Sequence, residues 1–309
     1  MLQQTQVATV IDYFNRFMQR FPSVERLANA NIDEVLHLWS GLGYYARGRN
    51  LHKAAKIIRD EHNGELPATL EEITALPGIG RSTGSAILAI AHGKRHAILD
   101  GNVKRVLTRL RCIEGPPDAS ATQKVLWPLA ESLTPHARIA DYTQAIMDLG
   151  ATLCRRSNPD CEICPVENLC EAKSTGTQAD FPNKKPRKKI PTREARFLRI
   201  LNSTQNVLLY RRPPSGIWGG LWCLPELKAD ESIERWCENN GFKLQGEPHD
   251  LAPHKHTFTH FHLRMLTTEI EVGANSSIIM DTENYAWYDP RNPTNLGLAK
   301  PMAKFIHGQ

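Results

Sequence analysis

Residues 76–103 read LPGIGRSTGSAILAIAHGKRHAILDGNV, and this stretch decides the fold of the first half of the chain. Its glycines at positions 78 and 80 permit positive φ and let backbone N–H groups approach an anion closely. A helix that begins near Ser82 and is apolar over residues 85–91 would add the attraction of its N-terminal dipole. The residues alone leave an alternative open, because plain glycine turns between helices are common.

Apolar residues at three- and four-residue steps predict further helices on both sides of this hairpin. The stripe of the first helix consists of Val7, Val10, Ile11, Phe14, Phe17, Met18 and Phe21. We expect two more helices to begin at Asn31 and Thr69, each with glutamate three residues later in a capping box. Others are predicted at residues 51–58, 103–111 and 139–153. No strand is evident before about residue 172, so the first domain should be all-α.

The second half of the chain has a different pattern. Residues 174–194 combine three prolines with basic side chains, which is typical of a semi-extended linker. Strands are then predicted at residues 197–201, 207–210, 257–268 and 285–288, and a helix at 232–240, stopped by Gly241. The predicted organisation is an all-α domain over residues 1–173, a basic linker over 174–194 and an α+β domain over 195–309.

Composition limits the class of protein without identifying a partner. A chain of 309 residues with 41% hydrophobic residues can build two cores. It has no apolar run long enough to span a membrane and no secretory signal, so we expect a reducing, cytoplasmic setting. The net charge is +5, and residues 180–193 alone, with six basic residues and one acidic residue, account for it. A nucleic-acid partner must therefore be argued from local sites.

Four of the seven cysteines form one cluster, C154-x6-C161-x2-C164-x5-C170. A thiolate quartet within so short a segment predicts a single metal centre, and both zinc and a [4Fe–4S] cluster suit these soft ligands. Only one pair is close in sequence, which favours the bulkier cluster over a zinc ion. The odd total argues against a disulfide framework, so Cys112, Cys223 and Cys237 are predicted to be buried thiols.

LPGIGRSTGSAI, LDGNVKRV and the four-cysteine loop, in this order, resemble the helix–hairpin–helix glycosylases of the endonuclease III superfamily. RRPPSGIWGGLWCLPE, residues 211–226, resembles the Nudix-like domain that the MutY-type adenine DNA glycosylases carry and endonuclease III lacks. The resemblance implies base-excision DNA repair and a [4Fe–4S] cluster on Cys154, Cys161, Cys164 and Cys170. It also implies that Gly78, Gly80 and Arg81 hold DNA.

The resemblance assigns roles around the target adenine. Asp100 matches the aspartate used at the sugar, where a fixed carboxylate can stabilise or trap an oxocarbenium ion; on the residues alone it could equally be a helix N-cap. Ser82 stands where lyase-type members have the lysine that attacks C1′, which implies a monofunctional glycosylase. Asn102 and Gln144 would lie near the flipped base, although Gln144 could be a surface helix position.

Other positions match residues that read the rest of the mispair. Gln4 and Tyr44 match the side chains that wedge into the duplex when a base is extruded. Phe258, Thr259 and His260 match the loop that contacts 8-oxoguanine opposite adenine, with threonine where many members have serine. The implied partner is double-stranded DNA with an adenine:8-oxoguanine or adenine:guanine mispair. We expect a monomer that works in the bacterial nucleoid.

One departure from the family pattern affects the expected activity. The resemblance begins at Met1, the glutamate thought to protonate adenine would lie before that position, and no acidic residue precedes Asp12. Loss of a general acid typically costs about 10²–10⁴ in rate. A missing upstream segment should also leave apolar surface uncovered near the cluster lobe. The alternatives are an active glycosylase whose recorded start is misplaced and a mispair-binding fragment with impaired catalysis.

Two further functions are disfavoured. A lyase would need an amine where this chain has Ser82. A nucleotide hydrolase of the Nudix type would need a glutamate-rich metal-binding helix. The corresponding stretch here, ESIERWCENNG at residues 231–241, lacks that array.

Overall fold

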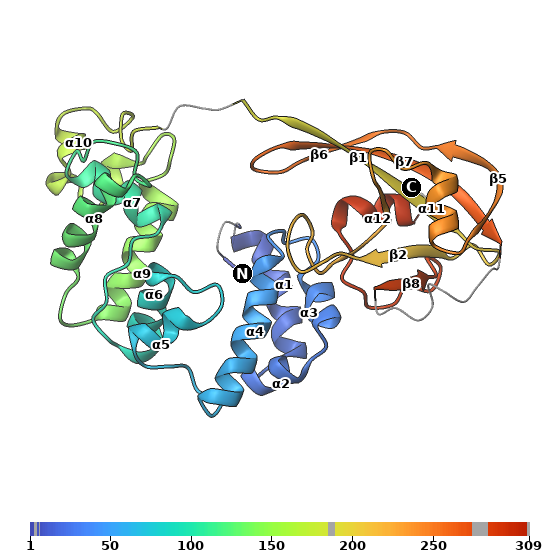
Figure 1. The fold of residues 1–309 in the computed structure, drawn as a ribbon. Coiled ribbons are helices and arrows are strands. Elements are labelled where there is room, and N and C mark those ends of the chain that lie inside the picture. The colour runs from blue at the N-terminus through green and yellow to red at the C-terminus, as the bar shows by residue number, and fades with distance from the viewer. Residues whose placement is uncertain (3–4, 6, 185–188, 274–283, 308–309) are drawn as a thin grey trace. The chain divides into compact units, whose positions relative to one another are not determined.

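The computed structural model describes residues 1–2, 5, 7–184, 189–273 and 284–307, and it divides the chain into two compact units (Figure 1). The first unit combines residues 1–60 with 189–309, and the second consists of residues 61–188. This division by packing differs from the division into residues 1–173, 174–194 and 195–309, which stays a proposal. No described helix has both the length and the apolar character needed to span a bilayer.

The second unit is helical. Its elements are α5 (Leu70–Ala75), α6 (Arg81–His92), α7 (Gly101–Leu110), α8 (Ser120–Leu133), α9 (Ile139–Asp148), a π-helical turn (Leu149–Leu153), two 3₁₀ turns (Cys161–Ile163 and Glu167–Leu169) and α10 (Glu171–Ser174). The helices predicted around residues 85, 103 and 139 are confirmed. So is the cap of α5, where Thr69 Oγ1 accepts from the Glu72 N–H at 3.3 Å and bonds the Glu72 carboxylate at 2.6 Å.

Four helices begin the first unit: α1 (Val7–Arg20), α2 (Val24–Asn29), α3 (Ile32–Trp39) and α4 (Ala46–Glu61). Asn31 does cap α3, but the predicted capping box is wrong, because its side chain accepts from the Asp33 N–H and Glu34 instead pairs with Arg20. Helix α2 was not predicted, since six residues are too short to show a clear period.

Helix α1 is only partly covered by the rest of its unit. Val10, Phe17 and Phe21 are buried in a core with Trp39. A second set of apolar side chains on α1 is 40–63% exposed: Val7, Ile11, Phe14 and Met18. They recur at four-, three- and four-residue steps and so share one face of the helix. The uncovered apolar surface expected near the cysteine loop stays a prediction, because this exposed face belongs to the first unit and the cysteine loop to the second.

The Nudix-like part of the first unit is an eight-stranded sheet whose main path runs β3–β2–β1–β7–β5. The strands are β1 (Thr192–Leu201), β2 (Val207–Arg211), β3 (Trp222–Cys223), β4 (Glu226–Leu227), β5 (Lys243–Asp250), β6 (His254–Thr257), β7 (His262–Gly273) and β8 (Tyr285–Tyr288). Strand β1 pairs antiparallel with β2, as the predicted hairpin requires, and parallel with β7. The single strand predicted over residues 257–268 is wrong: β6 ends at Thr257, a turn follows, and β7 begins at His262.

Strand β1 carries buried side chains on both faces of the sheet. Leu198 and Ile200 pack with Trp236 of α11 (Ile233–Asn239). Phe197 and Leu201 point to the other face and pack with Phe305 of α12 (Lys300–Ile306). Leu36 of α3 joins that second core and is fully buried. The first sixty residues therefore share a core with the Nudix-like sheet.

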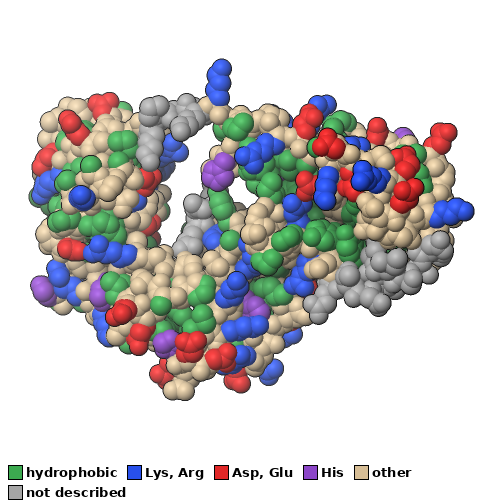
Figure 2. Space-filling view, viewed as in Figure 1, with side chains coloured by type: hydrophobic (Ala, Val, Ile, Leu, Met, Phe, Trp, Pro, Cys, Tyr) green, Lys and Arg blue, Asp and Glu red, His purple; other side chains and the backbone are tan. Residues whose placement is uncertain are grey.

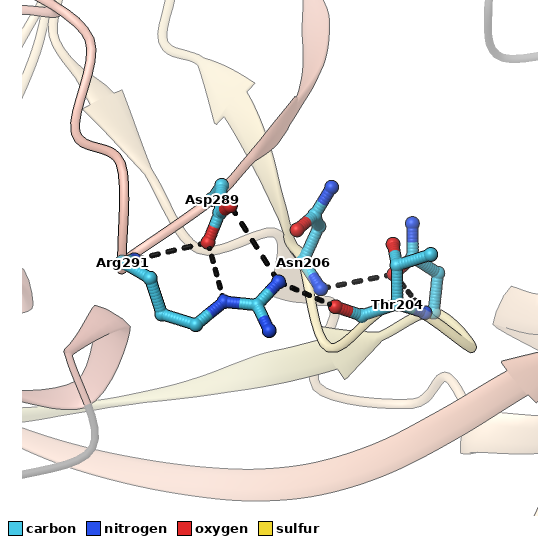
Figure 3. Close-up of polar contacts among 5 residues, drawn as sticks. Thr204, Asn206, Asp289 and Arg291 are labelled. Carbon is cyan, nitrogen blue, oxygen red and sulfur yellow. Dashed lines mark hydrogen bonds and ion pairs between the residues drawn. The ribbon is translucent and has the colours of Figure 1, made fainter.

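The β1–β2 hairpin is held by a polar network (Figure 3). The side-chain oxygen of Asn202 accepts from the backbone N–H groups of Thr204 and Asn206 at 3.1 and 2.9 Å, an arrangement typical of an Asx turn. Arg291, beyond β8, donates to the carbonyl of Thr204 at 2.9 Å and to Asp289 at 2.9 Å. Hydrogen bonds from the side chain and backbone of Arg291 lower the pKa of the Asp289 carboxyl. The network therefore ties the turn of the hairpin to the segment that follows β8.

Candidate functional site

The hairpin predicted to hold DNA joins α5 to α6. Gly78 has φ +80°, and the N–H of Ile79 donates to the carbonyl of Leu76 at 3.2 Å, which closes the turn. Gly80 is the N-cap of α6 and has no side chain to cover the first N–H groups of the helix. Those donors and the helix dipole leave a place for an anion. Arg81 lies over the Trp127 ring at 3.8 Å and pairs with Glu131 at 2.6 Å.

The backbone of Leu99 links Ser82 to the neighbouring Asp100. The Ser82 hydroxyl accepts from the Leu99 N–H at 2.9 Å, which ties α6 to the residue before the aspartate. Asp100 is the N-cap of α7, and its Oδ1 accepts from the Val103 N–H at 2.8 Å. The N-cap alternative is therefore confirmed as geometry. It does not compete with a chemical role, because a cap is one way to hold a carboxylate still.

Asn102 and Gln144, both predicted to lie near the flipped base, have different surroundings. Asn102 accepts from Arg105 Nη2 at 2.8 Å, and its Cβ lies against Gly150, where an added Cβ would approach to 2.6 Å. The glycine thus allows α7 to pack closely on the turn after α9. Gln144 is exposed and donates to Asp148 at 2.8 Å within α9, which is the surface helix position that the residues alone allowed.

The four clustered cysteines line one cavity, together with Val106, Leu149 and Arg109. The π-helical turn Leu149–Leu153 precedes the first of these cysteines, and the Cys154 N–H donates to the Leu149 carbonyl at 2.7 Å. Such turns are rare and occur often at functional sites. Among the described residues, no three Cys, His, Asp or Glu side chains are arranged to hold a single metal ion. The donor set is four soft thiols around a shared space.

The thiols of this loop influence one another. Burial raises the pKa of Cys164 and of Cys170, and the charges of Cys154 and Cys161 raise it further. A group that brings positive charge into the cavity would relieve that repulsion. The other cysteines differ: Cys223 and Cys237 are buried as predicted, with burial raising the pKa to about 12 and about 11, whereas Cys112 is only half-buried.

Two arginines of α7 hold the cysteine loop, and sequence reasoning missed both. Arg105 donates to the carbonyls of Cys154 and Gly150 at 2.7 and 2.6 Å. Arg109 is 2% exposed and donates from Nη1 to Cys154 Sγ at 3.3 Å and to the Arg155 carbonyl at 2.7 Å. Their spacing of four residues, on the same helix as buried Val106, was the available signal.

The first unit carries the other predicted recognition residues. Tyr44 has φ +47°, and the loop before it contains Gly41 at φ +98° and Gly43 at φ +71°. The Gly43 carbonyl accepts from the Trp39 indole at 3.2 Å, and the Arg47 guanidinium lies 5.4 Å from the centre of the Tyr44 ring. Tyr44 is nevertheless 51% exposed. The Tyr44 ring is thus exposed to solvent, while side-chain hydrogen bonds hold the backbone of the preceding Gly43.

Phe258, Thr259 and His260 form the turn between β6 and β7. Phe258 packs on Phe261 and Trp218, with ring centres 4.8 and 5.6 Å apart, and its N–H donates to the Phe261 carbonyl at 2.9 Å. Thr259 and His260 are exposed. The turn therefore has an aromatic base and a polar tip. Trp218, which sequence reasoning did not single out, is the buried part of that base.

The predicted residues are distributed over both units. Asp100, Ser82, Asn102, Gln144, the hairpin and the cysteines belong to the second unit, whereas Tyr44 and the 258–260 turn belong to the first. Gln4 lies outside the described residues. Figure 2 shows Lys and Arg interspersed with Asp and Glu on the visible face, so charge does not single out a site there.

Comparisons with known proteins agree with both halves of this description. Residues 1–132 match the profile of the HhH-GPD superfamily of base excision DNA repair proteins, and residues 196–308 match a NUDIX domain profile. In solved structures, a thermostable thymine-DNA glycosylase has a TM-score of 0.50 at 27% identity, covering 56% of this chain and 80% of that one.

Curated relatives extend the match over the whole chain. The adenine DNA glycosylase of Buchnera aphidicola subsp. Baizongia pistaciae is 38% identical over 307 residues, 99% of this chain and 86% of that protein. The human adenine DNA glycosylase is 35% identical over 85% of this chain and 58% of its own length. Similarity this long includes the hairpin, the aspartate, the cysteine loop and the Nudix-like sheet. The chain is therefore a DNA glycosylase and belongs to the adenine DNA glycosylase family.

Proposed function

We propose that this chain is a monofunctional adenine DNA glycosylase. It hydrolyses the N-glycosidic bond of adenine mispaired with 8-oxoguanine or guanine, as a monomer on the DNA of the bacterial nucleoid. The observation that carries the proposal is the fixed carboxylate of Asp100, capped onto α7 and tied through Leu99 to Ser82 of the hairpin helix. A glycosylase needs such a carboxylate at the sugar, since positive charge develops at C1′ as the base leaves.

The cap suits Asp100 to this role. Oδ1 is held by the Val103 N–H, so the carboxylate loses little freedom when substrate binds, and we assign the contact with the sugar to this fixed carboxylate. Ser82 bonds a backbone N–H and offers no amine, so the sugar cannot be captured as a Schiff base at that position. Water would then complete the hydrolysis, and the product would be an abasic site with its strand intact.

We propose that Cys154, Cys161, Cys164 and Cys170 hold a [4Fe–4S] cluster. Four soft thiols that line one cavity suit this cluster, and the spacing of one close pair between longer loops favours it over a zinc ion. Bound there, the cluster would stabilise the 154–170 loop and supply no step of the hydrolysis. Arg109 would donate a hydrogen bond to the sulfur of Cys154, a contact of the kind that tunes such centres.

Reading of the opposite base is assigned to Phe258, Thr259 and His260. The tip of their turn offers a hydroxyl and an imidazole, both exposed and able to meet a base edge. We assign the wedge to Tyr44 and Gln4, the adenine edge to Asn102 and Gln144, and phosphate contact to Gly78, Gly80 and Arg81. Nucleotide hydrolysis is not proposed, because α11, IERWCEN, lacks an acidic array.

The test incubates the chain with duplexes that contain adenine opposite 8-oxoguanine, adenine opposite guanine, or cytosine opposite 8-oxoguanine. We expect alkali-labile sites in the two adenine strands only, no strand break without alkali, and no adduct after borohydride. A borohydride-trapped adduct would contradict the monofunctional mechanism. Selective binding without alkali-labile sites would contradict the proposed hydrolysis.

A further inference from the structure

Arg81, to which phosphate contact is assigned, is held by a neighbouring helix of the second unit. The central carbon of its guanidinium lies 3.8 Å from the centre of the Trp127 ring, and Nη2 donates to the Glu131 carboxylate at 2.6 Å. Trp127 and Glu131 both belong to α8 and are four residues apart, so they share one face of that helix. Arg81 belongs to the first turn of α6, so the two contacts join α6 to α8.

These contacts fix where the guanidinium lies and leave it open to solvent. Trp127 is partly buried and packs against the core cluster that contains Leu126, so its ring is a fixed platform. The side chains of Arg81 and Glu131 are 52% and 51% exposed. They line a hollow on α8 together with Lys124, a second basic side chain. An anion that arrives from solvent can therefore reach Arg81 without any change in the core.

A DNA phosphate and the Glu131 carboxylate bind an arginine in the same way. Both are anions that accept hydrogen bonds from the guanidinium N–H groups. The start of α6 favours an anion beside Arg81, since the N-cap Gly80 has no side chain to cover the first N–H groups of the helix. Arg81 cannot offer its full charge to such an anion while Glu131 neutralises it.

We propose that Glu131 is an autoinhibitory residue for DNA binding: its carboxylate competes with a DNA phosphate for the guanidinium of Arg81. Binding of a duplex then exchanges one ion pair for another, and the cost of breaking the first reduces the affinity. This inference rests on the proposed phosphate contact of Arg81. Because phosphates carry no base sequence, the competition weakens binding to every duplex alike and leaves the choice of mispair to other residues.

The test is equilibrium binding of the full chain to one undamaged duplex over a range of salt concentrations. Glu131→Gln keeps the size of the side chain and removes its charge. It should tighten binding by about 2- to 5-fold at low salt, the value of an exposed ion pair. The gain should shrink as salt is raised, since salt screens exposed charges. Arg81→Gln should weaken binding, and Glu131→Gln added to it should bring no gain.

Asp141→Asn is the matched control, because it removes the same charge from the same unit, from an exposed pair with Arg138 that is 2.8 Å long. It should leave the dissociation constant nearly unchanged. A Glu131→Gln protein that binds no tighter than the control, or that gains as much in the Arg81→Gln background as in the unaltered chain, would overturn the inference alone. An Arg81→Gln protein that binds as tightly as the unaltered chain would overturn the phosphate contact itself, and the inference with it.

Discussion

Replacing Arg109 with methionine should lower the free energy of unfolding of the helical unit, residues 61–188, by about 3–5 kcal/mol. The guanidinium is 2% exposed and makes three bonds of 3.0 Å or less, to the carbonyls of Gln178, Phe181 and Arg155. Bonds from a charged donor contribute about 1.5–3 kcal/mol each after solvation is counted, and two of the three share the Nε hydrogen, so they count as about two bonds. Methionine fills the space and leaves the buried carbonyls unpaired. The loop that carries Cys154 would lose one of its two arginine anchors and keep Arg105.

The assay is urea unfolding of the cluster-loaded chain, followed by far-ultraviolet circular dichroism and by visible absorption of the cluster. The matched control is Arg111→Met. Arg111 lies at the end of the same helix, its side chain is 43% exposed, and its bonds to Leu169 and Glu171 are 3.3 and 3.2 Å long, so we expect a change within about 0.5 kcal/mol. An Arg109→Met protein as stable as the control would refute the anchoring role.

Three further results are expected. Cys164→Ser should lose the broad visible absorption of a [4Fe–4S] centre and weaken DNA binding; an unchanged spectrum would refute the cluster assignment. His260→Ala should reduce the preference for 8-oxoguanine over guanine and leave general DNA affinity nearly unchanged, whereas equal losses on both duplexes would remove its reading role. Burial and Lys56 lower the pKa of His52, so the folded state binds fewer protons than the unfolded state and stability should fall as pH drops below about 6.5. Urea midpoints for His52→Gln that decline as steeply with acid as those of the unaltered chain would contradict this cause.

The sequence predicted most helices because their apolar residues share one face. Val10 and Phe17 are buried in α1 as the period requires, yet Val7 and Phe14 of the same stripe are exposed. A period shows which side of a helix is apolar, and the neighbours decide how much of it is covered. Helix α8 escaped prediction because Pro128 lies inside it and few of its residues are buried.

Turns without glycine or proline were the hardest to predict. TFTHFH, residues 257–262, has the threonine and aromatic residues typical of a strand, whereas the structure reverses the chain there and packs Phe258 on Phe261. The π-helical turn at Leu149–Leu153 is equally hidden, since its residues continue the helical pattern of α9.

Site residues that lie in a recognisable motif could be predicted from the sequence. Residues whose role depends on groups that are distant in sequence were missed. Asp100 and Ser82 could be found in their motifs. Arg109 could not, because its role depends on carbonyls near residues 155 and 178 that folding brings to it. The hydrogen bond between the Tyr44 hydroxyl and Thr259 Oγ1, 3.3 Å long, likewise depends on a core shared by the first sixty residues and the sheet.

The central claim, that Asp100 is the carboxylate of an adenine glycosylase, is tested most directly by single-turnover adenine release from an adenine:8-oxoguanine duplex. The unaltered chain should release adenine. Asp100→Asn, which can still cap α7, should release almost none, and Asp118→Asn, an exposed aspartate paired with Lys104 in the same unit, should behave as the unaltered chain. Release by Asp100→Asn at an undiminished rate, or no release by the unaltered chain, would contradict the account.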